Sequence, residues 1–202
     1  MLSYVVAMDN PFQLLLPVSL GVGLAAAAGF RVFLPLLAMG LAVKAGYVPV
    51  SENFQWLATT PALLMLAVAA VTEIVAYYVP VLDNLLDGIA GPTAIGAGIA
   101  MSYAVLGDMP PMLKWTLAII AGGGAAAATQ GATTLLRGTS TLTTAGIGNP
   151  VVATLEILSA ILMSLLAIIF PYVALVAVLI FIAITWRLIR RLRRRQTVAT
   201  PS

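Results

Sequence analysis

The 202-residue sequence contains no cysteine and no histidine. Their absence excludes disulfides, thiolate and imidazole metal sites, and every catalytic mechanism that needs either side chain as nucleophile or base. Charge is also scarce, because Asp, Glu, Lys and Arg make up only 8% of the chain, against about 25% in a soluble domain. So few charges cannot cover a water-exposed surface. We therefore expect most of the chain to face lipid or other apolar helices.

Apolar residues make up 61% of the chain, and a membrane-spanning helix needs about 20 of them in a row. Five stretches are candidates: 12–43, 57–82, 92–106, 112–137 and 150–189. The first is too long for one straight crossing, so it either tilts strongly or breaks near Gly29–Pro35. The last is expected to make two crossings that turn at Phe170–Pro171. The sequence thus predicts an all-α, polytopic membrane protein of about six hydrophobic helices, some of them broken or re-entrant.

The pattern favours one membrane domain over residues 1–189, with candidate halves 11–91 and 112–189, and a basic, disordered tail over 190–202. Six of the ten basic residues gather near the C-terminus: Arg187, Arg190, Arg191, Arg193, Arg194 and Arg195. By the positive-inside rule this cluster predicts a cytoplasmic C-terminus in the inner membrane. Its expected partner is anionic lipid headgroups rather than nucleic acid.

Several helix starts are indicated by a residue placed before proline, because a capping side chain can accept from an unpaired amide and proline at the first position has none to leave unpaired. The pairs are Asn10–Pro11, Thr60–Pro61 and Asn149–Pro150, with Gly91–Pro92 a weaker case. Residues 138–150, GTSTLTTAGIGNP, are small, hydroxyl-rich and nearly uncharged. We expect them to form a non-helical or re-entrant segment at membrane depth, with an external loop as the alternative.

Charged residues inside apolar runs are the strongest functional signal. An Arg or Asp at mid-membrane costs about 2.5–3.5 kcal/mol on insertion scales, so such residues are expected to pair inside the bundle. The sequence predicts Arg31 with Glu73, and Arg137 with Glu156. A substrate or proton site is our preferred interpretation, and ion pairs that only fix helix packing are the alternative.

A polar stripe is predicted on residues 72–88, TEIVAYYVPVLDNLLDG. If this segment is one helix, spacings of four, three, four and three place five residues on one face. They are Glu73, Tyr77, Pro80, Asn84 and Asp87. Asp83 and Asp87 are also weak candidates for a shared magnesium ion, as on a lipid-diphosphate enzyme. No cofactor is otherwise indicated.

Two stretches resemble each other weakly: residues 23–37, GLAAAAGFRVFLPLL, and residues 123–137, GGAAAATQGATTLLR. Each stretch is followed by a break and then by a helix that starts at a residue–proline pair and carries one Glu. The pair and the Glu are Thr60–Pro61 and Glu73 in the first half, and Asn149–Pro150 and Glu156 in the second. We expect an inverted or parallel internal repeat, as in transporters whose sites lie at broken helices.

The chain resembles the bacterial domain-of-unknown-function 4126 membrane protein family. The resemblance is carried by AAAGFRVFLPLL around Arg31, VTEIVAYYVPVLDNLLD at 71–87 and GNPVVATLE at 148–156, and it covers most of residues 19–170. It implies a small polytopic membrane protein and supplies no reaction.

Together these features favour an integral membrane transporter or channel-like protein for a small or anionic solute, coupled to protons or ions, rather than an enzyme. The alternatives are a lipid-phosphate translocase, a magnesium-dependent lipid or prenyl enzyme, and a non-catalytic scaffold. A homo-oligomer is compatible with the sequence. The predicted binding residues are Arg31, Glu73, Tyr77, Asn84, Asp87, Arg137, Asn149 and Glu156.

Overall fold

The structure, a computed structural model, describes the backbone of residues 11–107 and 109–198. Side chains are described within these ranges except at 11–13, 80, 81, 83–85, 87, 189 and 192–198. Every element in the described ranges is helical, which confirms the predicted all-α class. The elements are α2 (Pro11–Ala28), α3 (Phe33–Lys44), the 3-10 helix η1 (Glu52–Ala58), α4 (Thr60–Ala76), α5 (Pro80–Val105), α6 (Pro111–Leu117), the π-helical turn η2 (Ala118–Gly123), α7 (Gly124–Thr144), α8 (Asn149–Ile169) and α9 (Pro171–Val198).

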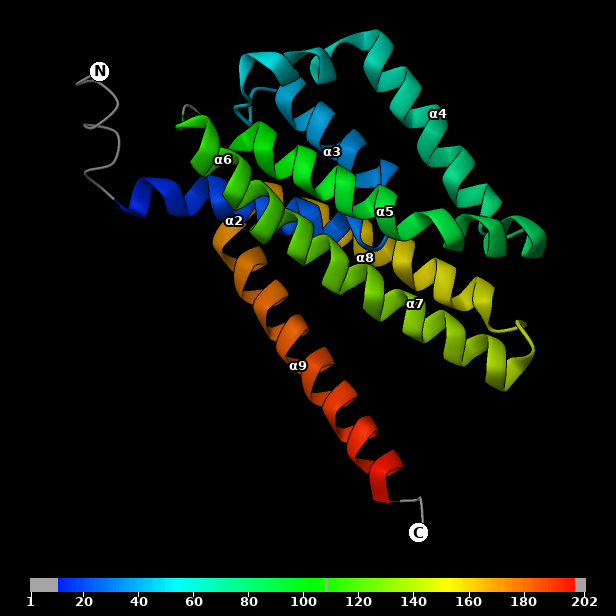
Figure 1. The fold of residues 1–202 in the computed structure, drawn as a ribbon. Coiled ribbons are helices and arrows are strands. Elements are labelled where there is room, and N and C mark those ends of the chain that lie inside the picture. Colours follow the sequence, from blue (N-terminus) through cyan, green and yellow to red (C-terminus); the bar gives the residue numbers. More distant parts are fainter. Residues whose placement is uncertain (1–10, 108, 199–202) are drawn as a thin grey trace.

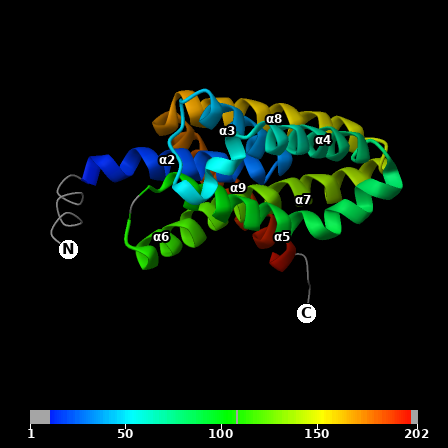
Figure 2. The same ribbon diagram turned by 90° about the horizontal axis from the view of Figure 1, so that it is seen from above.

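Helix α2 lies at the centre of the bundle, in contact with α5, α7, α8 and α9 (Figures 1 and 2). Its small residues allow neighbouring backbones to come close, as is usual between membrane helices. A Cβ atom added at Gly23 would lie 2.7 Å from the Cβ of Ala167, and one added at Gly29 would lie 2.5 Å from the Cβ of Thr129. The glycines and alanines of 21–29 therefore set the distance between α2 and its neighbours.

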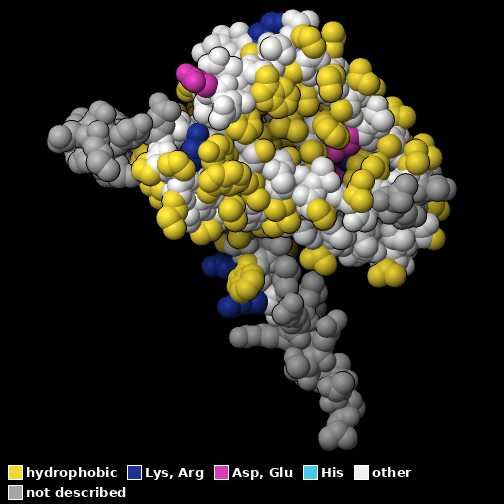
Figure 3. Space-filling view, turned by 45° about the horizontal axis from the view of Figure 1, so that its top comes forward, with side chains coloured by type: hydrophobic (Ala, Val, Ile, Leu, Met, Phe, Trp, Pro, Cys, Tyr) yellow, Lys and Arg dark blue, Asp and Glu magenta, His cyan; other side chains and the backbone are white. Residues whose placement is uncertain are grey.

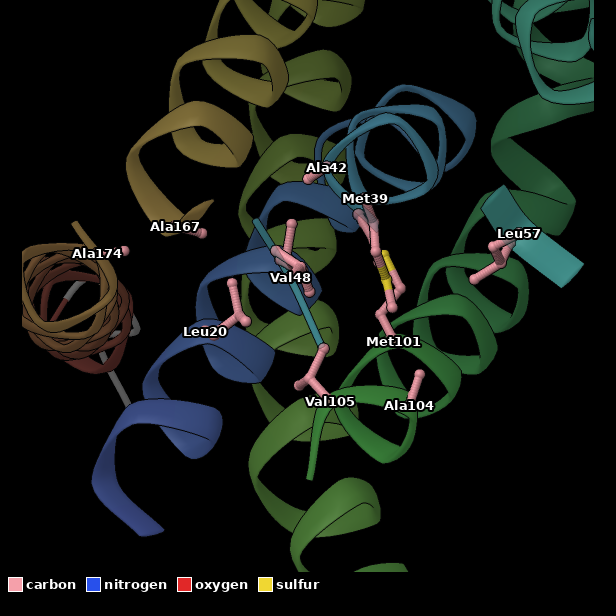
Figure 4. Close-up of a cluster of buried hydrophobic side chains, with 12 residues drawn as sticks. Leu20, Met39, Ala42, Val48, Leu57, Met101, Ala104, Val105, Ala167 and Ala174 are labelled. Atoms are coloured by element: carbon pink, nitrogen blue, oxygen red, sulfur yellow. The ribbon is translucent and has the colours of Figure 1, made fainter. Parts of the chain in front are cut away.

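The main apolar cluster lies between α2, α3, α5 and the start of α9 (Figure 4). Leu20, Met39 and Met101 fill its middle, and Ala167 and Ala174 close it on the α8–α9 side. Helix α9 runs away from the other helices toward its C-terminal end (Figure 1).

Within the described part of the chain, four helices are long and apolar enough to cross a membrane: Gly88–Val105 of α5, the continuous run Pro111–Thr144, α8, and Pro171–Leu188 of α9. Helix α4 and η1 together make a fifth candidate, bent by 68° between them. Apolar side chains, many of them large, are exposed along these helices, so the bundle contacts the lipid bilayer. The chain is thus a multi-pass membrane protein, as the sequence predicts.

The predicted positions of one helix break and one turn between helices are confirmed. The first apolar stretch breaks rather than tilts, because α2 ends at Ala28 and α3 begins at Phe33. The last stretch turns at Phe170–Pro171, between α8 and α9. Helix α9 continues to Val198 and so includes much of the range assigned to the tail, whereas 199–202 lie outside the described residues.

The prediction of one polar helix over 72–88 is wrong. Helix α4 ends at Ala76, and Pro80 is the first residue of α5 rather than a kink within a helix. The physical reason is that proline has no N–H to donate to the carbonyl of Ala76, four residues earlier. Glu73 therefore lies on α4 and Tyr77 in the turn that follows it. The Asn84–Asp87 segment belongs to α5. Gly91–Pro92 is also not a helix start, since Pro92 lies inside α5.

The non-helical segment predicted over 138–150 is shorter than expected. Helix α7 continues to Thr144, and only residues 145–148 form the turn to α8, with Ala145 left-handed at φ 51°. Hydroxyls that could have lined a cavity donate instead to carbonyls four residues earlier, as Thr144 Oγ1 does to Ser140 at 2.7 Å. The hydroxyl-rich sequence is thus satisfied within a helix.

The predicted capping residues are also partly wrong. Thr59, not Thr60, caps α4, its Oγ1 accepting from the amide of Ala62 at 3.4 Å. Asn149 is the first residue of α8, and its side chain bonds Thr141 rather than capping the helix. Asn10 lies outside the described residues.

Candidate functional site

The break between α2 and α3 places Arg31 inside the bundle. Phe30 and Arg31 still donate their amides to the carbonyl of Ala27, at 3.0 and 3.2 Å, so the chain leaves α2 in a tight turn. The Arg31 side chain is 1% exposed and reaches α8, where its Nη2 lies 2.9 Å from Glu156 Oε2 and 3.5 Å from the carbonyl oxygen of Ala153. The guanidinium is therefore held between the chain break and α8.

Glu156 is shared by two guanidiniums. Besides Arg31, it accepts from Arg137 on α7, whose Nε lies 2.8 Å from Glu156 Oε1 and whose Nη2 bonds Oε2. This bidentate contact confirms the predicted Arg137–Glu156 pair. All three side chains are buried, and such planar, two-point pairing is the strong form of an ion pair.

Tyr77, from the turn after α4, covers both guanidiniums with its ring. The Cζ of Arg31 lies 3.5 Å from the ring centroid, and the Cζ of Arg137 lies 4.4 Å from it. Cations over an aromatic face are attracted by its quadrupole, and more strongly where water is excluded. Tyr77 is thus brought to the predicted site, but as a stacking partner rather than as part of a polar helix stripe.

Glu73 does not pair with Arg31, which corrects the predicted pairing. Its Oε1 accepts from the amide of Val32 and its Oε2 from the amide of Phe33, each at 3.0 Å. These amides begin α3 and have no partner within that helix, so a carboxylate there satisfies two donors and the positive end of the helix dipole. Glu73 therefore binds the two amides at the start of α3 instead of the Arg31 guanidinium.

The cluster of Arg31, Arg137 and Glu156 carries more positive than negative charge. Among the described residues the two guanidiniums share the carboxylate of Glu156, and Arg31 Nε and Nη1 have no hydrogen-bond partner there. Glu73 balances the charge nearby without touching Arg31. Buried N–H groups without acceptors are costly, and this arrangement can therefore accept an anionic group.

A cavity of about 340 Å³ lies beside Tyr77, whose ring covers this cluster. Glu73 and Tyr77 line it together with Val32 and Phe33, while most of its remaining lining is apolar. Figure 3 shows acidic and basic side chains recessed in a hollow of the largely apolar surface. The cavity gives the Glu73–Tyr77 side of the cluster an opening between α4 and α5.

The remaining predicted residues do not all join this site. Asn149 lies at the start of α8, where its Nδ2 is 3.2 Å from Thr141 Oγ1. The side chains of Asn84, Asp87 and Asp83 lie outside the described residues, so their binding roles and the magnesium site stay predictions. Elsewhere in the described chain no three carboxylates gather to hold a metal ion.

Sequence reasoning missed the backbone groups of the site, namely the amides of Val32 and Phe33 and the carbonyl of Ala153. A signal for the first two was available. Pro35, as the third residue of α3, marks a helix start at the predicted break, and a helix start in an apolar setting needs an acceptor for its amides.

Comparisons with known proteins add the family. No curated protein and no solved structure matches the chain. A family model described as "Domain of unknown function (DUF4126)" matches residues 18–191, which include the break between α2 and α3 and the buried Arg31, Arg137 and Glu156. The chain therefore belongs to the DUF4126 family, a domain of unknown function.

Proposed function

We propose that the chain is a transporter-type protein of the inner membrane that carries a small anionic solute through a site at Arg31. The observation that supports this most is the buried Arg31 guanidinium. It shares the Glu156 carboxylate with Arg137, and among the described residues two of its N–H groups have no partner. A guanidinium offers a fork of donors that fits carboxylate and phosphate groups.

Glu73 is proposed as the coupling residue. As a carboxylate it accepts from the amides of Val32 and Phe33, at the end of a cavity that opens between α4 and α5. When protonated it loses part of this acceptor capacity and gains a donor. Proton uptake would then release the start of α3 to an incoming anion, and proton release would expel it.

The wider arrangement follows the same proposal. The Arg-rich end of α9 would place the C-terminus in the cytoplasm, against anionic lipid headgroups. Arg31 with Glu73, and Arg137 with Glu156, would be corresponding parts of an internal repeat. A homo-oligomer would bury the outer face of α9, where Val176 and Leu179 are exposed.

The test is uptake into proteoliposomes of labelled phosphate, sulfate and acetate, with choline as a cationic control, with and without a pH gradient. Wild type should take up at least one anion faster than protein-free vesicles and respond to the gradient. Arg31→Gln should lose uptake, Glu73→Gln should lose the response to the gradient, and the exposed control Glu52→Gln should match wild type. Uptake that equals protein-free vesicles for every anion would refute the proposal.

A further inference from the structure

The cavity beside Tyr77 stops short of the guanidinium that the proposed function uses. Glu73 and Tyr77 are part of its wall, whereas neither Arg31 nor Arg137 is among the described residues that line it. A second cavity of about 390 Å³ shares three wall residues with the first, and its described wall does not include these two arginines either. A solute in these cavities would therefore meet Tyr77 before it met Arg31.

The ring of Tyr77 is the partition between the cavity and the guanidiniums. Tyr77 lines the cavity and is only 7% exposed. It also lies over both arginines, with the Cζ of Arg31 at 3.5 Å and the Cζ of Arg137 at 4.4 Å from the ring centroid. A flat ring in this position separates the two spaces while it stays in place, and it connects them when it moves away.

Tyr77 is carried by the end of α4. Its amide donates to the carbonyl of Glu73 at 3.3 Å, and the amides of Tyr78 and Val79 donate to carbonyls in the last turn of α4, at 3.1 Å each. A hydrogen bond of 2.8 Å between the hydroxyls of Tyr78 and Thr154 also links this turn to α8. Helix α4 itself packs chiefly on α3 and η1. Residues at the end of such an element are the usual place for a hinge movement.

Glu73 holds the end of α4 against the start of α3. Its carboxylate accepts from the amides of Val32 and Phe33 at 3.0 Å each. Glu73 precedes Tyr77 by four residues, about one helical turn, so the carboxylate and the ring lie on the same side of α4. The contact that fixes the carboxylate on α3 therefore also keeps the ring over the guanidiniums.

We infer that Tyr77 is a gate between the cavity and Arg31, closed while Glu73 binds the start of α3 and open once this contact breaks. This inference rests on the proposed function, since it describes how a solute in the cavity reaches the Arg31 guanidinium. It assigns Tyr77 a positioning role, in which the ring controls access to Arg31 in addition to stabilising the buried charges.

The experiment is modification of arginines in reconstituted vesicles by phenylglyoxal, an uncharged reagent that adds to guanidinium groups, with the rate at each arginine read by peptide mass spectrometry. Arg187, exposed near the end of α9, is the internal reference. Glu73→Gln weakens the contact with α3. Thr72→Val is its matched control, because Thr72 lines the same cavity while its hydroxyl donates to the carbonyl of Val68 within α4 at 2.8 Å. All variants are labelled below their melting transitions.

In wild type we expect Arg31 to react several times more slowly than Arg187. Glu73→Gln should raise the Arg31 rate severalfold relative to Arg187, whereas Thr72→Val should leave it unchanged. Tyr77→Leu, which removes the ring, should also raise it, and Tyr77→Phe, which keeps the ring, should retain the protection of wild type.

An Arg31 rate that stays at the wild-type value in Glu73→Gln or in Tyr77→Leu would overturn the gate, because the ring would then be a fixed cover or no cover at all. If the rate rises in both variants but wild type takes up no anion, the gate stands and the proposed function fails. If anion uptake depends on Arg31 while its modification rate never changes, the proposed function stands and the gate fails.

Discussion

Replacing Glu156 with glutamine keeps the size of the side chain and removes the one carboxylate that two buried guanidiniums share. Arg31 would then lie over the Tyr77 ring without its carboxylate partner, and Arg137, over the same ring, would lose its bidentate contact. Removing one partner of a buried ion pair costs about 3–5 kcal/mol, because it leaves an uncompensated charge. For a chain of this size 1 kcal/mol shifts the melting temperature by about 2–4 °C, so the expected loss is about 6–20 °C.

The assay is thermal denaturation of purified protein in detergent, followed by size-exclusion chromatography with fluorescence detection. Glu52→Gln, at an exposed position, is the control for the chemical change and should lie within about 1 °C of wild type. The double variant Glu156→Gln with Arg137→Gln should recover part of the loss, because it removes one of the two guanidiniums that shared Glu156. If Glu156→Gln melts like Glu52→Gln, the shared carboxylate is not the counter-charge that we infer, and the argument for a cationic cluster fails.

Three further predictions follow from packing and backbone geometry. Gly29→Ala should prevent stable folding, because its Cβ would lie 2.5 Å from the Cβ of Thr129, whereas Gly124→Ala, with nothing within 4 Å, should be neutral or stabilising in the same melting assay. Tyr77→Leu should lower stability more than Tyr77→Phe, by about 1–2 kcal/mol, because only phenylalanine retains an aromatic face over the guanidiniums. Ala145→Gly should raise the melting temperature by a few degrees, because a left-handed alanine costs about 1–2 kcal/mol and glycine does not.

Much of the fold was predictable from the composition and from the positions of glycine and proline. The scarcity of charge and the lengths of the apolar runs predicted a polytopic helical bundle, and Gly29–Pro35 and Phe170–Pro171 marked true ends of helices. Proline alone did not tell a start from an interior position, since Pro80 begins α5 while Pro92 lies within it. Which role a proline takes depends on whether neighbouring helices accommodate the freed carbonyl, and that is decided by tertiary packing.

The site was predictable as a set of residues but not as a set of contacts. The energetic cost of burying a charge in an apolar run predicted that Arg31, Glu73, Arg137 and Glu156 would find partners inside the bundle. The predicted partner of Arg31 was wrong, because pairing by side-chain charge alone leaves out the backbone amides that bind Glu73. A carboxylate near a helix start competes for amides as well as for guanidiniums, and two amides held Glu73.

The consecutive residues Arg31, Val32 and Phe33 are held by acids from two different helices, Glu156 on α8 and Glu73 on α4. Helix α8 packs against α2, α3, α7 and α9, whereas α4 contacts chiefly α3 and η1 and leaves a groove beside α5. Loss of the Glu73 contact should therefore free α4 and leave α8 in place. In hydrogen–deuterium exchange we expect Glu73→Gln to speed exchange in a peptide that spans 32–36 and at the end of α4, by up to about tenfold for each 1.4 kcal/mol lost. Peptides of α8 around Glu156 should exchange as in wild type, and faster exchange there as well would mean that the two acids hold one rigid unit rather than a fixed half and a movable one.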